Sequence, residues 1–440
     1  MARRKKKLPT ESVTVTIDSL SPEGRGVARI DGKATFIAGA LAGEEVSFVY
    51  DNIRSKFSEG HVVEVLNASP DRVEAKCQHA DICGGCSLQH MDAEAQIKHK
   101  QSILLGHFEH LAHIQPNEIL APLTGPLWGY RKKARLGVRY VRKKERVLVG
   151  FREKSKPYLA VLNQCEVLHP SVGHRLLDLS QLIRSLACYE SIAQIEAAVD
   201  DTHTALIFRN LVDVNKQDKS KLISFAKDNS FDLYLQPKGP DSVQLLYPDT
   251  ADLSYSVEDG LHVHFKPADF TQVNSEINIK MVKRAIELLE LNDGDQLLEL
   301  FCGLGNFTLP LARRVSSVVA VEGDKSLIDR ANENAKQNNI SNVSYHVANL
   351  MEDVTGMPWL KGGYNKILID PPRSGAIEVL PHIVKLGAER ILYISCNPAT
   401  LARDSNYLIN EANYQLVKAG VMDMFPHTSH VESIALFIKK

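Results

Sequence analysis

From residue 272 onward, apolar residues alternate between the spacing typical of helices and short unbroken runs typical of buried strands. The predicted elements are helix Ser275–Leu291, strand Gln296–Phe301, helix Thr308–Arg314, strand Ser317–Glu322, helix Lys325–Asn338, strand Val343–Val347, strand Lys366–Asp370, helix Ile377–Leu386, strand Arg390–Ser395, and strands Tyr414–Phe425 and Ser433–Ile438. The last two strands are close in sequence and should be antiparallel. This order predicts a doubly wound α/β sheet over residues 269–440, with ligands at the carboxyl ends of its strands.

The N-terminal region has a different pattern, in which apolar and polar residues alternate over short segments typical of half-buried strands. These segments are SVTVTIDSL, GVARID, KATFIAG, EEVSFVYDNI and EGHVVEVLNA. Turns containing Gly24, Gly32 and Gly43 separate them. Five closely spaced strands over residues 10–69 predict a small β-barrel of the OB-fold type, which commonly binds single-stranded nucleic acid. A purely structural barrel is the alternative.

Residues 70–268 begin with a segment of helical composition, Asp92–His113, and then return to β patterning. The β-patterned stretches lie around residues 128–149, 200–209 and 233–265. This region is therefore predicted to be a β-rich central domain, which ends near Lys266.

Charge is spread unevenly along the chain, although its net value is only −1. Arg3–Lys7 contributes five consecutive positive charges, and Tyr130–Lys156 holds twelve Lys and Arg residues against two glutamates. In the second block the basic residues alternate with Leu, Val and Tyr, so a strand there would have one apolar and one cationic face. Such a face suits an RNA backbone, although a solvated tail and solvated hairpins would also explain the charges.

Three cysteines, Cys77, Cys83 and Cys86, form a C-x5-C-x2-C run in which two glycines separate the last pair. This spacing places three thiols on one tight loop and predicts a metal site. Cys165 is the candidate for a fourth ligand. The nearby His79 and His90 would favour zinc, and the spacing alone leaves zinc and an iron–sulfur cluster both open.

Four features follow predicted strands of the α/β sheet, where a ligand is expected. They are the glycine turn Gly303–Asn306, Glu322, Asn349 and the loop Asp370–Arg373. The turn is not a dinucleotide fingerprint, because Thr308 stands where the third glycine is required, and no P-loop Lys-Ser/Thr pair follows it. An acidic residue at Glu322 can accept hydrogen bonds from ribose hydroxyls, and Asn349 can recognise an adenine edge. Jointly these features resemble the S-adenosylmethionine-dependent methyltransferase fold.

Cys396 follows the strand ILYIS and predicts the chemistry. Carbon 5 of uracil is barely nucleophilic, but a thiolate added at C6 turns the ring into an enolate that can take a methyl group. This reaction needs a cysteine of lowered pKa and a base that afterwards removes the C5 proton. Glu432 is the candidate base, with His427 and His430 as alternatives. If these two residues had only structural roles, Cys396 would be a thiol buried in the core and Glu432 a residue of a surface turn.

The motifs FTQVN, DPPRSG, SCNP and HTSHVES resemble the RNA uracil-5-methyltransferase family, and GRGVARIDGKATFIAGALAGEEV resembles its RNA-binding TRAM domain. The resemblance covers nearly the whole chain and implies a Rossmann-like class I methyltransferase domain, an OB-fold (TRAM) barrel and a central iron–sulfur domain. It implies Cys396 as nucleophile and Glu432 as base. It implies a [4Fe-4S] cluster on Cys77, Cys83, Cys86 and Cys165. It implies S-adenosyl-L-methionine bound by Gln272, Phe301, Asn306, Glu322, Asn349 and Asp370.

Within the family, the TRAM-like barrel and the four cysteines favour the members that modify 23S ribosomal RNA, because transfer-RNA members are typically shorter and lack both. The expected partner is free or protein-poor 23S ribosomal RNA. Its target uracil must be flipped out of the RNA to reach the active site. Phe270 either stacks on RNA bases or packs in the core. We expect a cytoplasmic monomer without a membrane segment. The alternatives are a transfer-RNA methyltransferase, a radical enzyme and a non-catalytic RNA-binding protein. The cysteine spacing argues against the second, and Cys396 with Glu432 against the third.

Overall fold

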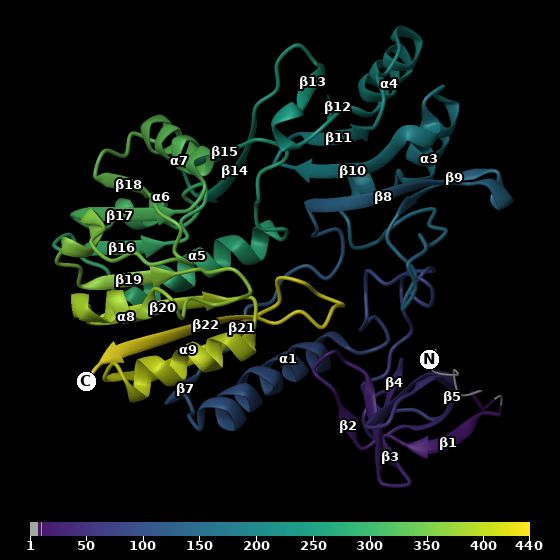
Figure 1. The fold of residues 1–440 in the computed structure, drawn as a ribbon, viewed down its shortest axis with the longest axis horizontal. Helices are drawn as coiled ribbons and strands as arrows, with labels where there is room; N and C mark the ends of the chain where they lie inside the picture. Colours follow the sequence, from purple (N-terminus) through teal and green to yellow (C-terminus); the bar gives the residue numbers. More distant parts are fainter. Residues whose placement is uncertain (1–7, 10) are drawn as a thin grey trace, which may run out of the picture.

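The computed structural model describes residues 8, 9 and 11–440, and the predicted basic tail Arg3–Lys7 lies outside the described residues. An N-terminal six-stranded sheet is followed by a central six-stranded sheet, a two-stranded hairpin and a C-terminal eight-stranded sheet (Figure 1). This succession agrees with the predicted barrel, β-rich region and α/β sheet. Within the described residues, no helix combines the length and the apolar character needed to cross a membrane.

The N-terminal sheet has the strand order β1-β5-β6-β4-β3-β2 and surrounds a small apolar core. Its strands are β1 (Val13–Thr16), β2 (Ser19–Leu20), β3 (Gly26–Ile30), β4 (Lys33–Ala38), β5 (Glu45–Ile53) and β6 (Phe57–Asn67). All five predicted segments are strands. The first is divided in two at Ile17, whose backbone N–H donates to the carbonyl of Glu44.

The central sheet has the order β13-β12-β11-β10-β8-β9, and two helices, α3 and α4, pack against it. Its strands are β8 (Lys133–Val141), β9 (Arg146–Gly150), β10 (Ile192–Val199), β11 (Thr204–Asn210), β12 (Phe231–Leu235) and β13 (Gln244–Tyr247). Helices α2 (Pro170–Gly173), α3 (Leu176–Ser185) and α4 (Lys216–Asn229) lie between them, and the hairpin β14 (Leu253–Glu258) and β15 (Leu261–Phe265) follows. Helix α4 was not predicted, because most of its residues are polar and its buried stripe is narrow.

Strand β8 carries the first half of the basic block. Its Ala134, Leu136 and Val138 are buried, whereas Arg135 and Arg139 are exposed. The predicted alternation of an apolar and a cationic strand face is therefore confirmed.

The C-terminal sheet has the order β18-β17-β16-β19-β20-β22-β21-β7. Its strands are β16 (Gln296–Leu300), β17 (Ser317–Glu322), β18 (Val343–Val347), β19 (Lys366–Ile369), β20 (Arg390–Ser395), β21 (Tyr414–Met422) and β22 (Glu432–Lys439), with β7 (Glu118–Ile119) at the edge. The helices are α5 (Ser275–Leu289), α6 (Thr308–Ala312), α7 (Lys325–Gln337), α8 (Leu380–Ile383) and α9 (Pro398–Asn410). Strands β16 to β20 are parallel and β22 is antiparallel to both neighbours, as predicted. The strand order reverses between β16 and β19, so the ligand site is expected at the carboxyl ends of these two strands.

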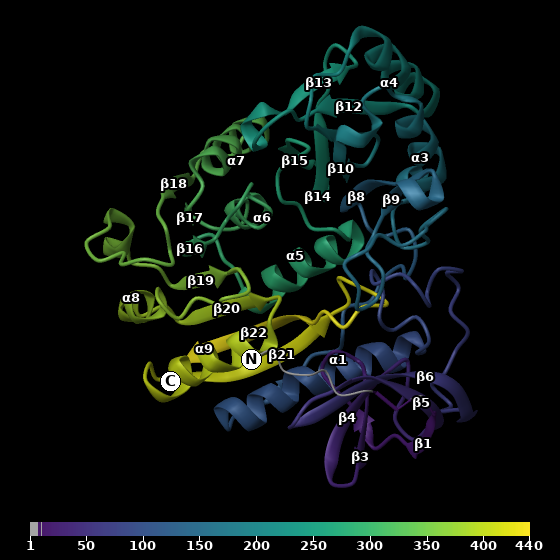
Figure 2. The ribbon, with the colours of Figure 1, turned by 45° about the vertical axis from the view of Figure 1, so that its right-hand side comes forward.

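Two elements from the N-terminal half complete this sheet. Helix α1 (Ala93–His107), which the sequence predicted, contacts α9 and β21, and β7 pairs with β21 in parallel. A short π-helical turn, Phe108–Ala112, extends α1. Figure 2 shows α1 between the N-terminal sheet and strands β21 and β22. The helix therefore lies between its neighbour in sequence, the N-terminal sheet, and the distant strands and helix at the end of the chain.

Candidate active site and cysteine cavity

A cavity of about 650 Å³ opens at the carboxyl ends of β16, β17, β19 and β20. The structure brings all eight residues predicted for catalysis and cofactor binding to its wall. They are Gln272, Phe301, Asn306, Glu322, Asn349, Asp370, Cys396 and Glu432. The strongly exposed ring of Phe270, 73% accessible, also lines the cavity and therefore does not belong to the core.

The glycine turn after β16 lines this cavity. Phe301 has a φ of 63°, a left-handed conformation that is costly for a residue with a side chain and that is typical of functional sites. The N–H of Gly303 donates to the Glu322 carboxylate over 3.2 Å, and the other oxygen of this carboxylate accepts from Gly323 N–H at 2.7 Å. Glu322 therefore ties the loop after β16 to the loop after β17.

Asn306 is held by two residues that the sequence did not single out. Its amide exchanges a reciprocal pair of hydrogen bonds with Asn278 of α5, at 2.8 and 2.9 Å. The hydroxyl of Tyr255 from β14 donates to the same Asn306 oxygen at 3.2 Å. The only signal for Asn278 was a polar residue on the apolar face of a helix, where it is 1% exposed.

Two carboxyl groups face the cavity, Asp370 directly after β19 and Glu432 as the first residue of β22. Burial raises the pKa of Asp370 to about 7. Burial, and then the charge of Asp370, raise the pKa of Glu432 to about 8, while Arg373 and Lys100 act in the opposite direction. A carboxylate with a pKa near 8 is a stronger base than an ordinary glutamate, and this range suits proton abstraction near neutral pH.

The thiol of Cys396 is half-buried in the same wall. Burial, and then the charges of Glu432 and Asp370, raise the pKa of this thiol to about 11. The positive charge of Arg373 acts in the opposite direction. The predicted lowering of this pKa is therefore wrong for this pocket, because the thiol is half-buried and two carboxyl groups stand beside it.

The Arg373 loop is fastened by α9, a helix that was not predicted. The Asn397 side-chain amide donates to the Arg373 carbonyl at 2.9 Å. About two turns into the helix, the fully buried Asp404 accepts from the Tyr393 hydroxyl at 2.6 Å and from the backbone N–H of Ala376 at 2.7 Å. These bonds fix the loop on which Asp370 and Arg373 lie.

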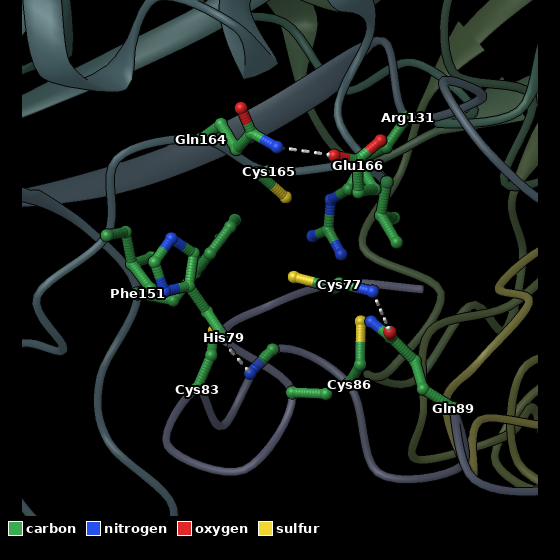
Figure 3. Close-up of a pocket in the computed structure, with 14 residues that line it drawn as sticks. Cys77, His79, Cys83, Cys86, Gln89, Arg131, Phe151, Gln164, Cys165 and Glu166 are labelled. Atoms are coloured by element: carbon green, nitrogen blue, oxygen red, sulfur yellow. Dashed lines mark hydrogen bonds between the residues drawn. The ribbon is translucent and has the colours of Figure 1, made fainter. Parts of the chain in front are cut away.

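A second, smaller cavity lies between the cysteine loop and the segment before α2. All four predicted metal ligands, Cys77, Cys83, Cys86 and Cys165, line it. In Figure 3 the side chains of Cys77, Cys86 and Cys165 point into the same central space. Burial raises the pKa of Cys86 to about 12 and that of Cys165 to about 11. The thiols thus surround a cavity rather than converge on one point, and among the described residues no three His, Cys, Asp or Glu side chains are grouped to hold a single metal ion.

The two histidines near the cysteine loop occupy different positions. His79 lines the cavity, but its Nε2 accepts a hydrogen bond from the backbone N–H of Asn163 at 3.2 Å. His90 lines another depression, and burial lowers its pKa to about 4. One ring nitrogen of His79 is thus already paired within the protein.

A family model described as tRNA (Uracil-5-)-methyltransferase matches residues 96–440, and one described as TRAM domain matches residues 6–63. The 23S rRNA (uracil(1939)-C(5))-methyltransferase RlmD of Francisella tularensis subsp. novicida is 49% identical, with 100% of this chain and 99% of that protein covered. The protein of the same name from Hahella chejuensis is 50% identical, with 100% of both chains covered.

Among solved structures, Pyrococcus abyssi tRNA (uracil-54, C5)-methyltransferase in complex with S-adenosyl-L-homocysteine has a TM-score of 0.74. It is 20% identical, and the match covers 97% of this chain and 99% of that one. The neighbour shows the same fold from end to end. The expectation that transfer-RNA enzymes lack the N-terminal barrel is wrong for this neighbour, so the barrel alone does not discriminate between RNA substrates.

Proposed function

Since the chain belongs to the uracil-5-methyltransferase family, we propose that it methylates C5 of a specific uridine in 23S ribosomal RNA with S-adenosyl-L-methionine as methyl donor. The observation that carries the proposal is the convergence of Cys396, Glu432 and Asp370 on one cavity at the carboxyl ends of the strands. The choice of ribosomal RNA is supported by relatives of that name, which are 49% and 50% identical over essentially the full length.

Transfer RNA is the second candidate substrate. The family model carries that name, and the crystal neighbour, also named as a tRNA enzyme, shares the fold over 97% of this chain. Its 20% identity is far below the 50% of the ribosomal RNA relatives, which favours the first candidate.

The six predicted cofactor residues would hold S-adenosyl-L-methionine. They fit this ligand because they line the cavity where the strand order reverses, and because Glu322 stands at the end of β17, where an acidic residue receives ribose hydroxyls. When bound, the cofactor supplies an electrophilic methyl group. The backbone of the Gly303 turn leaves room for close approach, since a Cβ on Gly303 would meet no atom within 4 Å.

Cys396 and Glu432 would carry the covalent steps. The Cys396 thiolate adds to C6 of the uracil, and the electron pair of the C5–C6 double bond moves into an enolate. The enolate takes the methyl group at C5. Glu432 then removes the C5 proton, the double bond forms again, and the bond between C6 and sulfur breaks to return the thiolate. Arg373 is the positive group that favours the thiolate, since it opposes the carboxyl groups that raise the pKa of Cys396.

We propose that Cys77, Cys83, Cys86 and Cys165 hold a [4Fe-4S] cluster. A cluster binds one thiolate at each of four irons and so needs cysteines around a space, whereas zinc needs its ligands around one point. The four thiols line a common cavity, which supports the cluster. Four iron atoms per chain and a visible absorption band are expected, and one zinc without iron would overturn the assignment.

RNA would be bound by the TRAM barrel together with the cationic face of β8, on which Arg135 and Arg139 are exposed. The target base must leave its stack to reach Cys396, which supports a free or protein-poor RNA as substrate. We also propose that the protein acts as a monomer, because one cavity already holds both proposed catalytic residues and all six proposed cofactor residues. All seven cysteines are free thiols in the structure, which suits the reducing cytoplasm.

The function is tested by incubating the protein with methyl-labelled S-adenosylmethionine and unmodified 23S ribosomal or transfer RNA. We expect label in ribosomal RNA, no transfer by Cys396→Ala, and a covalent protein–RNA adduct that accumulates with Glu432→Gln. Transfer that persists in Cys396→Ala would refute the covalent route. Label found only in transfer RNA would refute the choice of substrate.

A further inference from the structure

Helix α1 buries two polar side chains, Gln96 and Lys100, that are one helical turn apart. They are 1% and 0% exposed. Both contact the segment Asp423–Val431, here called the β21–β22 loop because it joins these two strands. Burying two such polar groups on one helix face costs free energy unless each is fully hydrogen-bonded. Their hydrogen-bond partners therefore identify the segment that the two side chains hold in place.

Lys100 is paired at the beginning of this loop. Its Nζ donates to Asp423 Oδ1 at 2.7 Å and to the carbonyl of Phe425 at 2.9 Å. Asp423 is itself 3% exposed. A buried ion pair contributes little net stability compared with an apolar pair of the same size, so its presence is better explained by what the charge or the geometry does.

Gln96 holds the middle of the loop at His427. Its Oε1 accepts from the His427 backbone N–H at 2.8 Å, and its Nε2 lies 3.2 Å from His427 Nδ1. His427 has a φ of 66°, and its carbonyl accepts from the backbone N–H groups of Ser87 and Leu88 at 2.9 and 3.0 Å. A left-handed histidine is costly and is kept only where several contacts determine it; Gln96 and the end of the cysteine loop supply those contacts here.

The β21–β22 loop carries residues of the active site. Phe425 and His430 line the large cavity, and Glu432 follows the loop as the first residue of β22. The charged and titratable groups around the Glu432 carboxyl are Asp370 and Cys396 from one side, Arg373 and His430 at the cavity wall, and Lys100 from α1. Lys100 is the group in this set that does not line the cavity.

We propose that Lys100 and Gln96 are positioning residues for Glu432: they hold the β21–β22 loop in the conformation that aims this carboxylate at C5, and Lys100 adds a positive charge to its surroundings. The inference rests on the proposed role of Glu432. Helix α1 precedes the α/β domain in the sequence, and the inference gives this helix a part in the last step of the reaction. In that step Glu432 takes the C5 proton and Cys396 leaves C6. The positive charge of Lys100 lowers the pKa of Glu432, which agrees with this role.

The test compares Lys100→Met/Asp423→Leu, Gln96→Met and Lys100→Arg with wild type in single-turnover methylation of 23S ribosomal RNA. The double variant removes both partners of the ion pair, so no unpaired charge remains to unfold the protein. The covalent protein–RNA adduct is measured on denaturing gels from pH 6 to 9. Glu432→Gln serves as the benchmark, and Lys98→Met, at an exposed position of the same helix, serves as the control.

We expect methyl transfer to persist in the double variant and in Gln96→Met while release of the product slows roughly 10-fold to 100-fold, so that methylated adduct accumulates. Lys100→Arg, which keeps the positive charge, should release the product faster than the double variant. Wild-type release in folded double and Gln96→Met variants would overturn the inference. An absence of adduct in Glu432→Gln would instead refute the proposed role of Glu432 itself.

Discussion

Replacing Glu432 by Gln should flatten the dependence of stability on pH, because the buried carboxyl of the wild type is costly to ionise. Burial and the charge of Asp370 raise the pKa of Glu432 from 4.5 to about 8. In this window the folded protein keeps a proton that the unfolded chain releases. The free energy of unfolding contributed by this group is therefore fully present below pH 4.5 and is lost as the pH rises toward 8.

The size of this effect on the free energy of unfolding follows from the single proton that the folded protein keeps and the unfolded chain releases. Each pH unit inside the window changes the free energy of unfolding by about 1.4 kcal/mol. Between pH 5 and 7 the wild type should thus lose about 2–3 kcal/mol that Glu432→Gln retains. Any change in packing or hydrogen bonding that the glutamine introduces would shift the stability equally at both pH values, so the difference between them isolates the ionisation.

The assay is urea unfolding of both proteins at pH 5, 6, 7 and 8, followed by tryptophan fluorescence and circular dichroism. Glu287 lies exposed on α5 and offers a matched control, because Glu287→Gln keeps the same chemistry away from the cavity. We expect its curve to run parallel to that of the wild type. If the Glu432→Gln curve is parallel as well, the carboxyl is ionised at the same pH in the folded and unfolded chains, and the reasoning from burial fails.

Three further outcomes are expected for other parts of the molecule. Asp404→Ala should lower the free energy of unfolding by about 2–6 kcal/mol, since two buried donors lose their acceptor; thermal unfolding checks this, and adding Tyr393→Phe should recover part of the loss. Cys165→Ser should lower the iron content per chain, whereas Cys188→Ser, outside the cavity, should leave it unchanged; equal iron in both would exclude Cys165 as a ligand. Arg139→Gln should reduce the slope of log binding constant against log salt concentration by about 0.7–0.9 if this side chain neutralises one phosphate, as titrations of RNA binding over a range of salt would show.

Much of the site could be predicted because its motif residues directly follow apolar strands. The carboxyl ends of parallel strands meet at one edge, so the sequence alone led us to expect Glu322, Asp370 and Cys396 together. Helix α9 was missed, although its Asn397 cap and following proline are a recognised helix start. Its role in fastening the Arg373 loop is tertiary and leaves no local pattern.

The partners of the site residues could not be predicted, because they lie far away in sequence. Asn278 bonds a residue 28 positions away, and Lys100 bonds one 323 positions away. The pKa of Cys396 was misjudged for the same reason. The reaction requires the thiolate form of Cys396, and this requirement led to the prediction of a lowered pKa. The carboxyl groups that raise the pKa reach the thiol only because β19, β20 and β22 come together in the fold.

The short strand β7 has a consequence for how the protein can be dissected. It pairs with Lys418 and Ala419 of β21, while Leu104 of α1 and Phe108 of the following π-helical turn are buried beside the same strand. A fragment restricted to residues 269–440 would keep every proposed catalytic residue. It would, however, expose the unpaired edge of β21 and the apolar surface that α1 and the π-helical turn cover in the full chain. Open strands of this kind recruit other chains. Such a fragment is therefore expected to aggregate, and a soluble minimal enzyme would have to begin before α1.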